Sequence, residues 1–331
     1  MESSGQQPPD QPGITSAQTP PKPGSPLKFV FFNERELRAG WRLLIYLGLA
    51  FVTGWALGWI ARLISPEIPR VITPLIVIVQ DTLLIAVFVI PAAIMARMER
   101  RSLADYGLPL RQAFGRNLWL GAAWGIGALT VLLIVLRLNR SFLFGNIGLG
   151  WRDALWYGAL WAVAMYLVGV AEEFMLRGYS QFTLTTGIGF WPAAGLLSLA
   201  FAALHLTNPG ETVVGISSVV AIGLFFAFTL YRTGTLWFAI GMHAAWNWGQ
   251  TFLYGVPNSG MVARGHLLNP VIQGPRWYSG GTAGPEGSVL VFPLIALMFV
   301  IFHRTFPKEV RYPALAAAGR VTPQRTEPLP G

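Results

Sequence analysis

The stretch that decides the fold is ALWYGALWAVAMYLVGVAEEFMLRGYSQFTL, residues 154–184. Its first part carries no charge and is long enough to cross most of a bilayer, which takes about 20 apolar residues. Glu172, Glu173 and Arg177 then follow within six positions. Charged side chains are costly in lipid and usually serve a function there. The stretch therefore predicts a membrane helix that carries a polar site.

The composition of the whole chain supports a membrane setting. Hydrophobic residues make up 53% of the 331 residues and charged residues only 12%, with a mean hydropathy of +0.50. A soluble domain of this length carries about twice that charged fraction. We therefore expect an all-α, polytopic membrane helical bundle.

Eight apolar runs are candidates for transmembrane helices. They are residues 41–64, 72–95, 118–136, 154–176, 190–205, 213–231, 236–253 and 288–302. We expect one integral membrane domain over residues 27–312, with a catalytic core at about 154–253. The segments 1–26 and 313–331, rich in proline and small or polar residues, are expected to be disordered cytoplasmic tails.

Lys and Arg gather before the first run, at residues 97–116, and after residue 303. Cytoplasmic loops retain basic residues, so with eight spans both termini are expected to be cytoplasmic, in a bacterial cytoplasmic membrane. The net charge of +9 arises from residues that border the apolar runs. Contact with anionic membrane lipids explains this pattern, and we expect no nucleic-acid partner. The absence of cysteine excludes disulfides and thiolate catalysis.

Helical spacing assigns different roles to the two adjacent glutamates. Glu173 and Arg177 are four residues apart and share a helix face, whereas Glu172 is rotated from Glu173 by about 100°. Glu173 is thus expected to pair with Arg177, which leaves Glu172 for chemistry. With a turn at residues 187–189, Glu172 and His205 lie at equal distances from the turn, so we expect them at equal depth.

Two further polar pairs have the same four-residue spacing. His243 and Asn247 share one helix face, and the Phe201 ring is expected to pack against His205. His243, however, is nearer to its own turn at Gly234 than Glu172 and His205 are to theirs. The first hairpin must then project further, or its turn lies elsewhere. For Asp81, in the second apolar run, a structural role is favoured over membership of a site.

Three motifs in this region resemble those of one protein family. Glu172-Glu173-Phe-Met-Leu-Arg177, Phe201-Ala-Ala-Leu-His205 and His243-Ala-Ala-Trp-Asn247 match, in order, the EExxxR, FxxxH and HxxxN/D motifs of the CPBP family. That family includes type II CAAX prenyl endopeptidases and bacteriocin self-immunity proteins. The resemblance covers residues 172–247.

The resemblance implies an intramembrane endopeptidase. Glu172 and His205 would activate water for attack on a peptide carbonyl, with Glu173 and Arg177 setting the local charge balance. His243 and Asn247 would donate hydrogen bonds to the oxyanion. A lipid-anchored or membrane-associated peptide or protein is the implied substrate.

Two questions stay open at this level. Glu172, His205 and His243 could instead bind a divalent metal such as zinc, whose catalytic sites use such ligands. The motifs could also belong to a protein that cleaves nothing: a bacteriocin-immunity or scaffolding protein, or a proton- or ion-coupled transporter. A glutamate–arginine pair can be purely structural, and single membrane histidines often only link helices.

Overall fold

The computed structural model describes residues 31–32, 36–64 and 73–319. The chain divides into two compact units, residues 1–38 and 39–331. In the described part of the first unit, Phe32 and Leu37 form an antiparallel bridge. The expected N-terminal tail, residues 1–26, lies outside the described residues. All elements below belong to the second unit.

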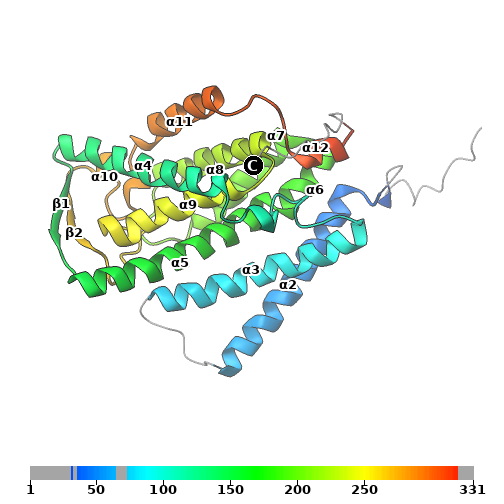
Figure 1. Cartoon of the computed structure of the whole chain (residues 1–331), viewed down its shortest axis with the longest axis horizontal. Helices are drawn as coiled ribbons and strands as arrows, with labels where there is room; N and C mark the ends of the chain where they lie inside the picture. The colour runs from blue at the N-terminus through cyan, green and yellow to red at the C-terminus, as the bar shows by residue number, and fades with distance from the viewer. Residues whose placement is uncertain (1–30, 33–35, 65–72, 320–331) are drawn as a thin grey trace, which may run out of the picture. The chain divides into compact units, whose positions relative to one another are not determined.

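The second unit is mostly helical. Its long helices are α2 (Ala39–Ile64), α3 (Pro74–Glu99), α4 (Arg116–Leu138), α5 (Trp151–Arg177), α6 (Tyr179–Ile188), α7 (Phe190–His205), α8 (Val213–Thr233), α9 (Trp237–Trp248) and α11 (Val291–Thr305). Short elements are η1 (Leu110–Gln112), the π-helical η2 (Gly249–Tyr254), α10 (Arg276–Ser279), η3 (Pro285–Gly287) and α12 (Pro313–Ala317). Figure 1 shows their arrangement.

Five helical stretches in the described residues are long and apolar enough to cross a membrane. They are α2, α3, α4, the combined stretch Trp151–Ile188 and α8. The expectation of eight spans is therefore not confirmed. The helices α7 and α11 are apolar but shorter, and α9 has only 12 residues before the π-helical segment. An apolar run in the sequence can thus exceed the helix that forms within it.

A small sheet departs from the all-α expectation. Strands β1 (Phe142–Ile147) and β2 (Leu268–Ile272) pair antiparallel, with Phe142 opposite Ile272 and an irregularity between Leu143 and Asn146. Gly145 lies at this irregularity with a φ of +71°, a conformation that favours glycine. The two strands lie in connections that are far apart in sequence, so the local sequence pattern did not predict their pairing.

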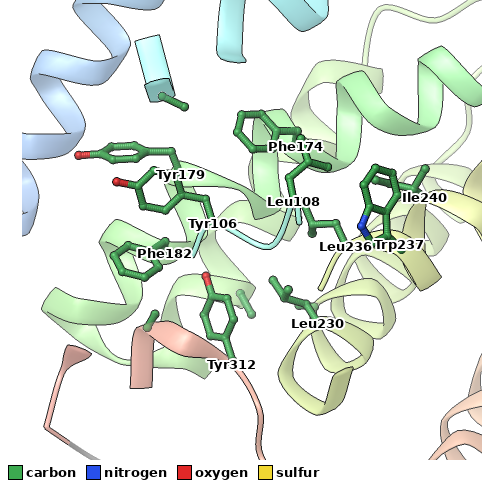
Figure 2. Close-up of a cluster of buried hydrophobic side chains, with 14 of the residues drawn as sticks. Tyr106, Leu108, Phe174, Tyr179, Phe182, Leu230, Leu236, Trp237, Ile240 and Tyr312 are labelled. Carbon is green, nitrogen blue, oxygen red and sulfur yellow. The ribbon is translucent and has the colours of Figure 1, made fainter. Parts of the chain in front are cut away.

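The helix α12 modifies the expected boundary at residue 312. Residues Pro313–Ala317 are helical, and Ala314 and Leu315 are buried. They join a core cluster that contains Tyr106, Tyr179 and Phe182 (Figure 2). The Tyr106 ring meets Tyr179 and Phe182 edge-on, each at 5.0 Å between centroids. The ordered part therefore extends past residue 312.

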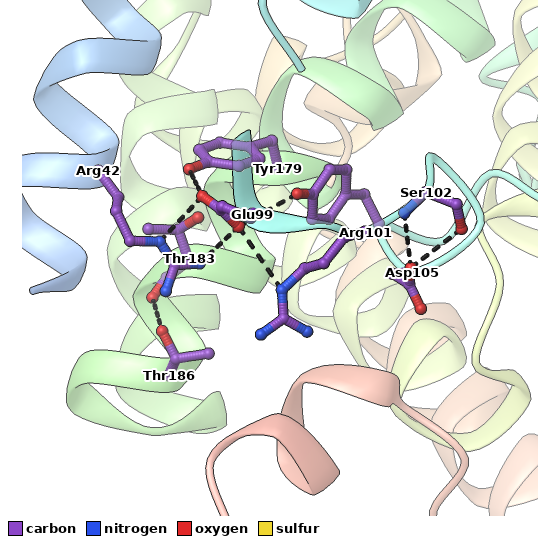
Figure 3. Close-up of polar contacts among 9 residues, drawn as sticks. Arg42, Glu99, Arg101, Ser102, Asp105, Tyr179, Thr183 and Thr186 are labelled. Atoms are coloured by element: carbon purple, nitrogen blue, oxygen red, sulfur yellow. Dashed lines mark hydrogen bonds and ion pairs between the residues drawn. The ribbon is translucent and has the colours of Figure 1, made fainter. Parts of the chain in front are cut away.

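Glu99 ties the ends of three helices together (Figure 3). Arg42 on α2 donates two hydrogen bonds to its carboxylate, at 3.0 and 3.1 Å. The Tyr106 and Tyr179 hydroxyls also donate to it, and Arg101 lies 3.6 Å away. A bidentate arginine–carboxylate pair fixes orientation as well as distance. This cluster holds α6, which follows the glutamate motif, against α2 and α3.

Glycines set the position of α9, which carries the third motif. A Cβ on Gly121 or Gly125 of α4 would lie 2.1 Å from the Phe238 carbonyl oxygen or 2.2 Å from that of Met242. Gly241 of α9 is equally tight against the Leu118 carbonyl. Small residues let membrane helices approach to backbone contact. The helix α9 is thus held closely against α4, and its other side packs on α5.

Candidate active site

The last turns of α5 present the glutamate motif as its spacing predicts. Glu173 and Arg177 are 0% and 1% exposed, and Arg177 Nη1 donates to Glu173 Oε1 at 3.2 Å. The predicted ion pair is confirmed. The Glu172 side chain remains 25% exposed. The two adjacent carboxylates thus have different environments.

Aromatic rings enclose the Arg177 guanidinium. Its central carbon lies 4.7 Å from the Phe201 ring centre and 5.7 Å from that of Phe226, which provides cation–π stabilisation. Gly223 on α8 makes room for it, since a Cβ there would lie 2.8 Å from Arg177 Nη2. Arg177 therefore fixes three helices around the buried carboxylate.

His243 bridges the two glutamates from α9. Its Nδ1 is 3.0 Å from Glu173 Oε1, and its Nε2 is 3.6 Å from Glu172 Oε2. Because a carboxylate accepts, Nδ1 is the protonated nitrogen at Glu173. The ring stacks on Phe226 at 5.6 Å. Glu173 thus holds His243 as well as Arg177, a second partner that helical spacing alone did not reveal.

His205 ends α7 with a fixed orientation. Its Nδ1 lies 2.8 Å from the Phe201 carbonyl oxygen, and its ring meets the Phe201 ring edge-on at 4.7 Å. The expected packing of Phe201 against the imidazole is confirmed. A carbonyl oxygen can only accept, so Nδ1 carries the proton and the Nε2 of the neutral ring is left as an acceptor.

The difference in depth between the histidines has a structural explanation. The turn lies at Gly189 (φ +94°), as expected, but α5 ends at Arg177 and α6 forms a separate helix before that turn. The first hairpin therefore has an additional helical segment beyond the site. Glu172, His205, His243 and Asn247 all line one cavity, which brings the four groups together.

Two cavities meet at these residues. The first has a volume of about 110 Å³ and is bounded by α8, α9, η3 and α11; the second, about 330 Å³, extends toward α3. Each could hold several water molecules. Residues that line both are Glu172, Phe201, His205, Asn247, Asn258 and Ser259. Asp81, for which the sequence favoured a structural role, lines the second cavity together with Glu172.

The zinc interpretation finds no support in this arrangement. Among the described residues, no three His, Cys, Asp or Glu side chains are grouped so that they could hold a metal ion. The Nδ1 atom is engaged in both histidines, with a carbonyl oxygen in His205 and with Glu173 in His243, so Nε2 is the ring nitrogen that each directs to other groups. Within the described part of the chain, Glu172, His205 and His243 are thus not grouped as a metal centre.

Several cavity residues were not identified from the sequence. Gln250, Asn258, Ser259, Glu211 and Glu286 line the first cavity. Gln250 could have been found, because it follows His243 and Asn247 at helical spacing, seven and three residues on. Glu286 lies in a connection rich in glycine and has no such signal. Burial raises its pKa to about 7, against the hydrogen bonds from Ser259 and Gln250 that lower it.

The family comparison agrees with the motifs. The family model described as type II CAAX prenyl endopeptidase Rce1-like matches residues 154–249, and the resemblance is thereby confirmed. No curated protein and no solved structure matches the chain. The matched segment begins in α5 and ends after α9, so it spans all three motifs. The segment 154–249 of this membrane protein is thus similar to the Rce1-like type II CAAX prenyl endopeptidases, a family of proteases.

Proposed function

We propose that the chain is an intramembrane endopeptidase in which Glu172 and His205 activate a water molecule. The observation that carries this is the position of Glu172, His205 and Asn247 on the wall shared by two cavities. A peptide that extends from one cavity into the other would pass directly over these groups. A nucleophilic water needs a base within hydrogen-bond reach, and Glu172 is the carboxylate open to both spaces.

In the proposed reaction, the Glu172 carboxylate accepts a proton from water while His205 Nε2 accepts a second hydrogen bond from it. The water oxygen forms a bond to the peptide carbonyl carbon, and the carbonyl oxygen becomes an oxyanion. Glu172 then returns the proton to the amide nitrogen as the C–N bond breaks. No cofactor is needed to balance this step.

His243 and Asn247 are proposed to stabilise the oxyanion. With Nδ1 bonded to Glu173, a protonated His243 ring offers its Nε2–H to a neighbouring oxygen. The Asn247 amide lines both cavities. One such donor contributes about 10² to 10³ in rate. Glu173 and Arg177 hold His243 in place and contact no substrate.

The proposed substrate is a lipid-anchored or membrane-associated peptide or protein. The chain is proposed to lie in the membrane with both of its termini in the cytoplasm. A prenyl group on that substrate is not assumed. The test is cleavage of peptides with and without a lipid anchor by purified protein in detergent. Wild type is expected to cleave, and Glu172→Ala, His205→Ala and His243→Ala to lose cleavage while each remains folded. Full cleavage by Glu172→Ala would overturn the assignment.

The runner-up is a proton-coupled transporter, and one observation favours it specifically. Asp81 and Glu172 line the same cavity, and intramembrane carboxylates in series can relay protons. Proton flux into liposomes that contain the protein distinguishes the two functions. Flux that depends on Asp81 and Glu172, in the absence of peptide cleavage, would favour transport.

A further inference from the structure

The connection before α11 contributes a carboxylate to the first cavity. Glu286, in η3, lines that cavity together with Glu172, His243 and Asn247. Its Oε1 accepts the Ser259 backbone N–H at 2.7 Å, and its Oε2 accepts from the Gln250 side-chain amide. Three separate segments thus meet at one carboxylate beside the proposed reaction centre.

Gln250 adds an acceptor that has no partner. Its Nε2 donates to the Pro257 carbonyl oxygen at 3.2 Å, and because a carbonyl only accepts, this fixes which end of the amide is which. The residue is 1% exposed, and its Oε1 is buried with no hydrogen-bond partner among the described residues. A buried acceptor left unpaired is costly, so a donor from a bound molecule would be favourable there.

Apart from its two histidines, the ionisable side chains that line this cavity among the described residues are carboxylates. Its lining contains the carboxylates Glu172, Glu211 and Glu286, and neither Lys nor Arg lines it among the described residues. Apolar side chains such as Ile222, Ile295 and Met298 form much of the remaining wall. At the Glu286 end, a free α-carboxylate would meet the Glu286 carboxylate and the unpaired Gln250 oxygen, which are both acceptors. A lysine or arginine side chain, with an apolar stem and a cationic head, matches both kinds of lining.

We propose that Glu286, with Gln250 and Glu211, forms a subsite that binds a basic side chain of the peptide substrate near the bond to be cut. This rests on the proposed function, because it places the substrate in the cavity that contains Glu172. It predicts cleavage beside a lysine or arginine within a chain, and it disfavours a free carboxyl terminus in this cavity.

The test uses synthetic peptides that differ at one position by lysine, norleucine or glutamate, scanned across the cleavage site. For wild type, kcat/KM is expected to be about tenfold higher with lysine than with norleucine at one position, because a charged hydrogen bond supplies about that factor. In Glu286→Gln the ratio should fall toward one. Glu309→Gln is the matched control, since Glu309 is 61% exposed and pairs with Arg311 away from the cavity, and it should keep the wild-type ratio.

Binding measurements separate this proposal from the proposed function. The same peptides, labelled with a fluorophore, are titrated against wild type and Glu286→Gln, with anisotropy as the readout. If nothing is cleaved but lysine peptides bind more tightly in a manner that requires Glu286, the endopeptidase assignment fails and the subsite stands. Equal binding of all three peptides to wild type, or preference for glutamate, would overturn the subsite. Should Glu286→Gln not fold, Glu211→Gln replaces it with the same expected direction.

Discussion

Glu172 and Glu173 are adjacent on one helix but have different environments, in line with the separate roles proposed for them. Glu173 is sealed, with Arg177 and His243 as partners and aromatic rings around them. Glu172, one residue away, lines two cavities, and its Oε2 lies 3.6 Å from His243 Nε2. Successive residues of an α-helix are rotated by about 100°, which is enough to give two neighbours different surroundings. The buried contacts of Glu173, which form the sealed side of the site, hold Glu172 and the cavities that it lines, the open side, in place.

The largest effect on the open side is expected from His205→Ala. Removing the Nε2 acceptor that orients water should lower kcat by about 10² to 10⁴, the usual range for acid–base groups. The unfolding temperature should change little, because the imidazole hydrogen bond that the described residues show is to Phe201 of the same helix. Steady-state cleavage and thermal unfolding of the same preparation measure both. His303→Ala, at the exposed end of α11, is the control and should retain kcat; equal losses in the two variants would contradict the assignment.

On the sealed side, Arg177→Met should act through stability. It leaves the buried Glu173 carboxylate without its cation, and breaking a buried pair in this way costs about 3–5 kcal/mol. The double variant Glu173→Gln with Arg177→Met should recover part of that loss. Unfolding in denaturant compares the three proteins. A single variant as stable as wild type would show that the pair does not hold the helices.

A smaller effect is expected where α4 meets α9. Gly125→Ala places a methyl group 2.2 Å from the Met242 carbonyl oxygen, and only a shift of α9 can relieve this contact. We expect a loss of about 1–3 kcal/mol, as for other overpacked sites, with reduced cleavage because His243 moves. Gly127→Ala is the matched control on the same helix, since a Cβ there meets nothing within 4 Å. Unchanged kcat in Gly125→Ala would show that the close contact between α4 and α9 does not position His243.

The smallest expected effect concerns the pH dependence contributed by Glu286. Its pKa is raised from 4.5 to about 7 by burial, with Glu211 acting in the same direction. The folded state therefore favours the neutral form of Glu286. Its contribution to the free energy of unfolding is full below about pH 4.5 and is lost as the pH rises through about 7. The unfolding temperature of wild type should fall by about 2–4 °C more than that of Glu286→Gln between pH 5 and 8. Parallel pH profiles would contradict this.

The sequence predicted much of the site because its residues lie on helices. Spacing of four residues identified the Glu173–Arg177 pair, and it placed Phe201 beside His205. It also put His243 and Asn247 on one face. These are local relations, and a helix conveys them whatever surrounds it.

Relations between distant segments were not predictable in the same way. The shared use of Glu173 by His243 depends on how α5 and α9 pack, and the Glu286 contacts depend on the path of a long connection. The β1–β2 pair likewise joins segments more than a hundred residues apart in sequence. The expected eight spans exceed the five helical stretches that are long enough to cross a membrane, because α7 and α11 are short and α9 ends as an α-helix at Trp248.

The most direct test of the account is to neutralise each glutamate separately and to measure kcat and unfolding temperature for both variants. Glu172→Gln is predicted to lose cleavage with an unchanged unfolding temperature. Glu173→Gln is predicted to lower the unfolding temperature strongly, because Arg177 and His243 lose the negative charge of their common partner. If Glu172→Gln cleaves as wild type does, or if the two variants behave alike, the separation of chemistry from support at this site is wrong.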